Sequence, residues 1–162
     1  MAKKSTQPVP AGYTTVTPGL CFESTAKAIE FYKEAFGAEE RERMVGPGGG
    51  IMHAELKIGN SIIMMADEMP GMTKSVQAHG GSPVNFYIYV ADADTAQRRA
   101  VAAGAKELYP VTDQFWGDRS GVVEDPFGLR WNFATHVTDL TTEEIREAGE
   151  AWMKKMASAH KG

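Results

Sequence analysis

The sequence has almost no cysteine and no long apolar run. Cys21 is the only cysteine among 162 residues, so the chain cannot form an intrachain disulfide. This fits a reducing compartment, and we expect a cytoplasmic protein. No apolar run approaches the roughly 20 residues of a membrane-spanning helix, and the polar start of the chain lacks the apolar core of a signal peptide. We therefore expect no membrane partner.

An excess of basic charge is also missing. The chain carries 17 Lys and Arg against 21 Asp and Glu, a formal net charge of -4, whereas nucleic-acid binders usually present a clustered basic face. The glycine-rich turn 46–50 lacks the lysine and the following helix of a phosphate-binding loop. No nucleophile stands beside a base, so covalent catalysis has little support. These absences favour a protein that acts on something other than nucleotides or nucleic acids.

What is present is an internal repeat. A helix-like stretch ends at Gly37, followed by Ala38 and Glu39, and a second one ends 67 residues later at Gly104, followed by Ala105 and Lys106. The segments 55–59 and 124–128 match in the same order at an offset of 69. Two anchors at nearly one offset predict a duplicated supersecondary unit. Paired half-domains leave a cleft, and ligand sites tend to lie in clefts.

Hydrophobic periodicity predicts the order strand, helix, strand, strand, strand in each half. We place the elements of the first half at 14–22, 25–36, 39–45, 51–58 and 61–66. Those of the second half lie at 84–90, 94–103 and 106–111, followed by a strand that ends at 124 and a last strand at 129–135. Asp94 with Gln97, and Thr141 with Glu144, resemble capping boxes of later helices. The predicted fold is α+β, in which two βαβββ modules form a curved mixed sheet.

The resulting division of the chain has five parts. They are a flexible arm (1–12), a first module (13–67), a linker loop (68–82), a second module (83–137) and an amphipathic C-terminal helix (138–162). The loop is the longest irregular stretch, which suits either a linker or a binding loop. The C-terminal helix lies outside the repeat, and its Trp152 must be buried on its own domain or on a partner.

Several polar side chains are candidates for a site. His53 and Glu55 stand two residues apart on a strand and share a face, so with His136 or Asp67 they could hold a metal; a solvated polar face is the alternative. Asp118 and Arg119 follow Trp116 in a turn, where Arg suits a carboxylate or phosphate and Trp a flat ligand, or where all three merely pack locally. Asn85, Tyr87 and Tyr89, with Asn132, are typical of a small-molecule pocket; the alternative is that the tyrosine hydroxyls merely reach the surface.

The duplicated βαβββ plan resembles the vicinal oxygen chelate superfamily of glyoxalase I, extradiol dioxygenases and bleomycin-resistance proteins. The stretches that carry the resemblance are 28–32 with Phe36-Gly37, and 124–128 with Trp131; the segment 113–119 is similar to the PhnB-like branch. The resemblance spans roughly 13–137 and implies a homodimer whose clefts are formed by paired modules.

Enzymes of this superfamily hold a divalent metal with His, Gln or Glu on the concave face. Carried over by position, the four ligands fall on Thr17, Met64, Asn85 and Asn132, or on Ile63 for the second if the register slips. None of these is a good ligand for zinc, nickel or iron. We therefore expect no cofactor, with a divalent metal as the alternative.

Three functions remain open. The first is a protein that binds a small organic ligand in the cleft without metal, with Thr17, His53, Glu55, Met64, Asn85, Tyr87, Trp116, Asp118, Arg119 and Asn132 as candidate lining residues. The second is a glyoxalase-type lyase or isomerase with a displaced metal. The third is a non-catalytic interaction module. Since fold does not imply function, the residues leave open whether any reaction is catalysed.

Overall fold

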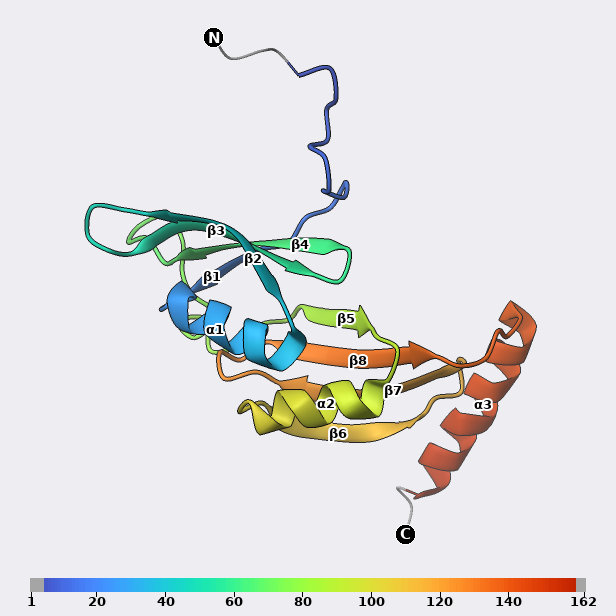
Figure 1. Cartoon of the computed structure of the whole chain (residues 1–162). Coiled ribbons are helices and arrows are strands. Elements are labelled where there is room, and N and C mark those ends of the chain that lie inside the picture. Colours follow the sequence, from blue (N-terminus) through green and yellow to red (C-terminus); the bar gives the residue numbers. More distant parts are fainter. Residues whose placement is uncertain (1–4, 160–162) are drawn as a thin grey trace. The chain divides into compact units, whose positions relative to one another are not determined.

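The computed structural model describes residues 5–159, which form two units. Unit 1 comprises the chain to Pro83 together with Phe127–Leu129, and unit 2 comprises Val84–Pro126 and the chain from Arg130 (Figure 1). Each unit contains one four-stranded mixed sheet, and the two strand orders, β1-β4-β3-β2 and β5-β8-β7-β6, are the same order displaced by four. The predicted α+β repeat is therefore confirmed.

Unit 1 follows the predicted element order closely. Its elements are β1 (Gly19–Phe22), α1 (Thr25–Phe36), β2 (Glu39–Val45), β3 (Ile51–Ile58) and β4 (Ser61–Asp67). Helix α1 ends at Gly37, which adopts the left-handed conformation with φ 67° that glycine tolerates best. One face of the sheet packs against α1, through Ala54, Leu56 and Met65 among others. The opposite face is not covered by this helix.

The first strand is shorter than predicted, and this is a correction. The expected strand over 14–22 begins only at Gly19, because Pro18 has no N–H to donate to a ladder. Thr17 consequently lies outside β1, and its hydroxyl donates a hydrogen bond to the carbonyl of Thr14. Parallel pairing starts with Gly19 opposite Met64.

The core of unit 1 is aromatic. Phe22, Phe31 and Tyr32 contact Phe127, with ring centroids 5.3 to 6.1 Å apart in edge-to-face geometry. This explains why the turn Phe127–Leu129 belongs to unit 1 although it joins two strands of unit 2. The loop over 68–82 also packs on unit 1, since Ser75 is fully buried and the amide of Val76 donates to the carbonyl of Cys21.

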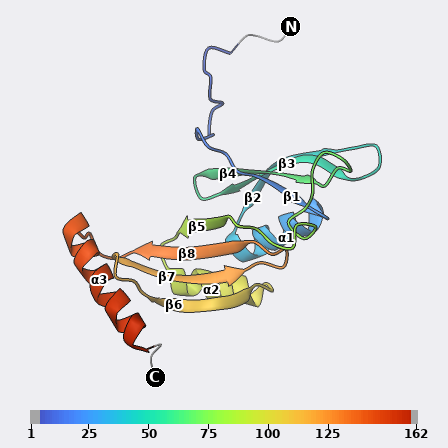
Figure 2. The ribbon, with the colours of Figure 1, turned by 180° about the vertical axis from the view of Figure 1, so that it is seen from behind.

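Unit 2 repeats the plan and adds a helix. Its elements are β5 (Asn85–Tyr89), α2 (Ala93–Ala102), β6 (Lys106–Asp113), β7 (Asp118–Glu124), β8 (Arg130–His136) and α3 (Thr142–Ala159). Helix α2 covers one face of the sheet, and Figure 2 shows the strands from the other side. Trp131 and Phe133 are buried, and Phe86, which is half-buried, stacks on Trp131 with centroids 4.6 Å apart.

The start of α2 differs from the predicted capping box. Asp92, not Asp94, is the N-cap residue, and its carboxylate accepts hydrogen bonds from the amide and hydroxyl of Thr95. Asp94 instead binds Arg119. Gln97 points into the core and donates to Glu107 and to the carbonyl of Tyr109. The sequence alone does not distinguish Asp92 from Asp94 as the N-cap residue, because both stand at the start of the helix. The structure decides, since Asp94 is bound to Arg119 and Gln97 is turned into the core.

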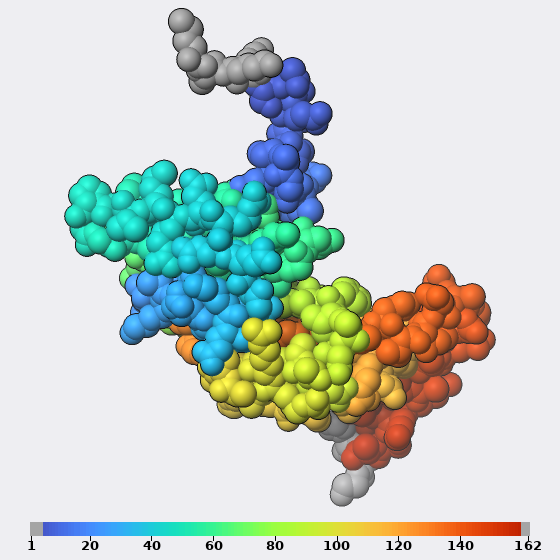
Figure 3. Space-filling view, in the orientation of Figure 1, coloured from blue at the N-terminus to red at the C-terminus, as the bar shows by residue number. Residues whose placement is uncertain are grey.

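Helix α3 begins as predicted. The carboxylate of Glu144 accepts from the amide of Thr141, and the hydroxyl of Thr141 accepts from the amide of Glu144, which is a capping box. The helix lies at the surface of unit 2 (Figure 3), where the ring of Trp152 contacts that of Phe115 at 5.8 Å. None of the helices in residues 5–159 combines the length and the hydropathy needed to cross a bilayer.

Candidate functional site

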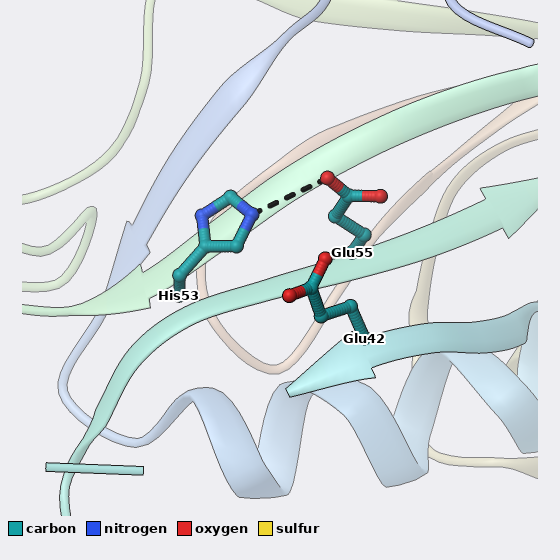
Figure 4. A group of neighbouring side chains, drawn as sticks. All are labelled: Glu42, His53 and Glu55. Atoms are coloured by element: carbon teal, nitrogen blue, oxygen red, sulfur yellow. Dashed lines mark hydrogen bonds and ion pairs between the residues drawn. The ribbon is translucent and has the colours of Figure 1, made fainter. Parts of the chain in front are cut away.

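The uncovered face of the unit 1 sheet carries a cluster of three metal-ligating side chains, Glu42, His53 and Glu55 (Figure 4). Strand β3 supplies His53 and Glu55 through its two-residue period, and β2 places Glu42 directly opposite Glu55. One potential ligand atom from each residue lies within 4.8 Å of the other two. The sequence predicted His53 and Glu55 as a pair but missed Glu42, because a bulge between Glu40 and Glu42 sets the register.

Glu55 is the centre of this cluster. Its side chain is buried, with a relative exposure of 6% for the residue, and Oε1 lies 3.3 Å from Nε2 of His53. The hydroxyl of Tyr13 also donates to Oε1 of Glu55. This hydrogen bond lowers the pKa of Glu55 and raises that of Tyr13, since it stabilises the carboxylate and the protonated phenol. Glu55 is therefore an ionised carboxylate on the sheet face.

The uncovered face of the unit 2 sheet is aromatic instead. Tyr87 and Tyr89 on β5 expose 51% and 64% of their surface, and their rings are 6.3 Å apart at an angle of 32°. Asn132 stands opposite Tyr87 on β8 and donates to the carbonyl of Phe86. Asn85 is exposed at the start of β5. Two adjacent exposed rings beside an amide offer flat apolar surface with polar groups in fixed positions.

A buried carboxylate organises the end of this face. Asp118 is 3% exposed and accepts from the hydroxyl of Tyr89 and from Nε1 of Trp116, each at 3.1 Å. Its other oxygen lies 2.8 Å from Nδ1 of His136, whose Nε2 lies 2.9 Å from Asp139. The carboxylate of Asp118, with that of Asp139, raises the pKa of His136, and the bond to Asp118 raises that of Tyr89. Sequence pattern predicted Trp116 and Asp118 together but not their link to Tyr89 and His136.

Arg119 is not part of this group. It lies beside Asp118 in sequence, but alternation along β7 sends its side chain the other way. There its Nε lies 2.7 Å from Asp94, and its Nη1 lies 3.0 Å from Asp113. Both carboxylates raise the pKa of Arg119. The guanidinium therefore stays charged, and its charge is already balanced by two carboxylates. Arg119 forms its ion pairs with Asp94 and Asp113 and not with the neighbouring Asp118.

The two partners considered for His53 and Glu55 are engaged elsewhere. Asp67 accepts from the amide of Thr25 at 2.7 Å and from the amide of Ile51 at 2.8 Å, which joins the start of α1 to the start of β3. His136 contacts Asp118 and Asp139 in unit 2. Glu42 is thus the third member of the cluster that the structure shows.

The duplicated α+β plan defines a protein of the glyoxalase-like fold class. The model of the Glyoxalase/Bleomycin resistance protein/Dioxygenase superfamily matches residues 15–133, and the chain belongs to this family. It is 39% identical over 137 residues to the uncharacterized protein Rv0887c of Mycobacterium tuberculosis, covering 82% of this chain and 81% of that protein.

Solved structures share the fold. The Arabidopsis thaliana gene product At5g48480 is similar with a TM-score of 0.61 and 33% identity, over 75% of this chain and 98% of that one. A PhnB protein from Bacillus cereus, described as a putative 3-demethylubiquinone-9 3-methyltransferase, has a TM-score of 0.60 at 19% identity, over 75% and 99% of the two chains, and shows the fold alone. The PhnB-like fold is thereby confirmed.

The residues that the resemblance assigns to the family's metal-ligand positions are not typical ligands of zinc, iron or nickel. Thr17 lies outside β1, and Met64 offers only a thioether, which suits soft copper. Asn132 uses its amide nitrogen to bind the carbonyl of Phe86, and Asn85 offers a neutral amide. Zinc, iron and nickel sites need imidazole, carboxylate or thiolate ligands, so this donor set does not fit them.

Proposed function

We propose that the protein binds a small organic molecule on the uncovered face of the unit 2 sheet, as in the bleomycin-resistance part of its family. The observation that carries the proposal is the adjacent pair of exposed rings, Tyr87 and Tyr89, beside Asn132. Exposed aromatic surface in fixed orientation stabilises a flat ligand by stacking, at about 0.5–1.5 kcal/mol for each ring pair beyond its area.

Asp118 supports this proposal because it fixes the polar edge of the face. By accepting from Tyr89 and Trp116 it orients both rings, so little conformational entropy is lost when a ligand binds. A cytoplasmic location and a homodimeric state complete the proposal. The half-buried, unpaired thiol of Cys21 is compatible with that location.

The test is thermal-shift and fluorescence titration of the purified chain with bleomycin and a panel of planar aromatic compounds. We expect at least one compound to raise the Tm of the wild-type chain. Tyr87→Ala should abolish the shift, while Tyr87→Phe, which keeps the ring, should retain most of it. Val101→Ala on the surface of α2 is the matched control. A panel that shifts neither Tm nor fluorescence, or that acts equally on Tyr87→Ala, would refute the proposal.

A further inference from the structure

The uncovered face of unit 1 carries a feature that the proposed ligand face in unit 2 does not use. Glu42 and Glu55 are register partners across β2 and β3, so two carboxylates face each other on neighbouring strands. Like charges directly opposite in a ladder destabilise the pair, on the order of 0.2–1 kcal/mol. Glu55 is buried as well, which increases the cost of leaving the pair without a cation.

We propose that Glu42, His53 and Glu55 form a binding site for a divalent transition-metal ion of the Zn²⁺ or Mn²⁺ class. One imidazole and two carboxylates are a donor set that these ions accept, whereas an all-oxygen set would favour Mg²⁺ or Ca²⁺. The imidazole and the carboxylates converge on one point of the sheet face (Figure 4).

The geometry needs little adjustment to receive an ion. Ligand atoms about 2.0–2.2 Å from a shared ion lie roughly 3–4.4 Å apart. The present separation of up to 4.8 Å closes by rotation of Glu42, whose side chain is exposed on an edge strand. Within residues 5–159, the side-chain hydrogen bonds of Glu55 to Tyr13 and His53 both use Oε1, and an ion held by His53 and Glu55 would take the place of the proton that these two side chains share (Figure 4).

This site is displaced from the one that the family uses. Of the family positions in unit 1, Met64 lies on β4 and Thr17 precedes β1, whereas the cluster lies on β3 and β2. Met64, at a family position, is the cross-strand partner of Glu55 and therefore shares its face. The chain thus lacks ligands at one position but presents an imidazole and carboxylates on the next strands of the same sheet.

The test uses the full, tag-free chain stripped with EDTA and dialysed against zinc chloride, manganese chloride or, as a control, magnesium chloride. We expect elemental analysis to find one zinc or manganese per chain and no magnesium. His53→Ala and Glu42→Gln should each weaken the affinity at least about tenfold by titration calorimetry. Glu39→Gln, on the same edge strand, and His79→Ala, in the loop, are the matched controls and should bind as the wild type does.

Histidine ring resonances in NMR identify the ligand directly. Zinc should shift the ring signals of His53 and leave those of His79, His136 and His160 in place. Circular dichroism checks that the variants fold, and Tyr87→Ala should still bind zinc, which separates this site from the proposed ligand face. Absence of stoichiometric metal in the wild-type chain, unchanged affinity in His53→Ala, or shifts at another histidine would overturn the proposal.

Discussion

At the scale of single residues, the side chains that matter most are buried polar groups whose partners lie far away in sequence. Asp118 contacts Tyr89 and His136, and Glu55 contacts Tyr13. A buried carboxylate is stable only with such partners, so each one fixes the position of several other side chains. The rigidity of both sheet faces therefore depends on individual carboxylates rather than on the general polarity of the surface.

His136 predicts how stability depends on pH. Asp118 and Asp139 both accept hydrogen bonds from its ring and raise its pKa above the ordinary value of 6.5. The stabilisation is complete below the pKa of the unfolded chain and is lost as pH rises through the higher folded pKa. The Tm of the wild-type chain should therefore fall relative to that of His136→Gln above about pH 6.5. Parallel Tm curves for the two proteins would contradict this.

The close packing around Gly121 predicts that a larger residue at this position destabilises the protein. A Cβ at this position would lie 2.8 Å from the amide nitrogen of Val111 and 2.9 Å from its Cγ2, closer than real Cβ contacts, while the same atom at Gly19 would meet nothing within 4 Å. Gly121→Ala should lower the free energy of unfolding by about 1–3 kcal/mol. Gly19→Ala is the control and should leave it nearly unchanged. Urea denaturation measures both, and equal midpoints would disprove the packing argument.

At the scale of elements, regular patterns made the repeat predictable. Strand β3 has the predicted bounds because apolar and polar residues alternate along it, and α1 ends where Gly37 permits a left-handed residue. The repeat was visible because Gly37, Gly59, Gly104 and Gly128 all adopt positive φ at matching places in the two halves. A residue with positive φ is a local requirement that glycine meets best, so these turns could be recognised from the sequence.

The parts that the sequence did not reveal depend on long-range contacts. The β2 bulge places Glu42 opposite Glu55, and a one-residue change of register would turn Glu42 to the other face. Likewise the carboxylate of Asp67 accepts from the amide of Thr25, the first residue of α1 and 42 residues earlier in the chain, whereas the N-cap residue Ser24 makes no side-chain cap hydrogen bond. Neither contact has a local signature, so the third cluster residue and the role of Asp67 at the start of α1 could be found only in the fold.

Asp67 predicts how α1 is joined to the sheet. Its two oxygens accept hydrogen bonds from the amides of Thr25 and Ile51. Hydrogen bonds to a charged group contribute about 1.5–3 kcal/mol each to the free energy of unfolding. Asp67→Ala should lower the free energy of unfolding by about 2–4 kcal/mol, and Asp67→Asn, which keeps one acceptor, by less. Chemical denaturation gives both values. Hydrogen exchange should also locate the loss at the amides of Thr25 and Ile51, and unchanged protection there would contradict the assignment.

At the scale of the whole molecule, the two units share one βαβββ plan but carry different side chains on their uncovered sheet faces. The sheet of unit 1 presents carboxylates and an imidazole, and the sheet of unit 2 presents tyrosines and amides. The helix-covered faces remain apolar in both units, because packing against α1 or α2 requires it. Duplication therefore preserved the core while the uncovered faces diverged, which is why family membership alone does not name the ligand.

The oligomeric state is the prediction that concerns the entire chain. We expect a homodimer by light scattering, with twice the 17.6 kDa mass of one chain. Trp152 on α3 contacts Phe115 but still exposes half of its surface, and aromatic residues are enriched where subunits meet. Trp152→Glu should therefore shift the dimer towards monomer, whereas Met72→Glu, at a highly exposed loop position, should not. A monomeric wild-type chain would refute the homodimer, and a Trp152→Glu chain that stays dimeric would place the interface away from α3.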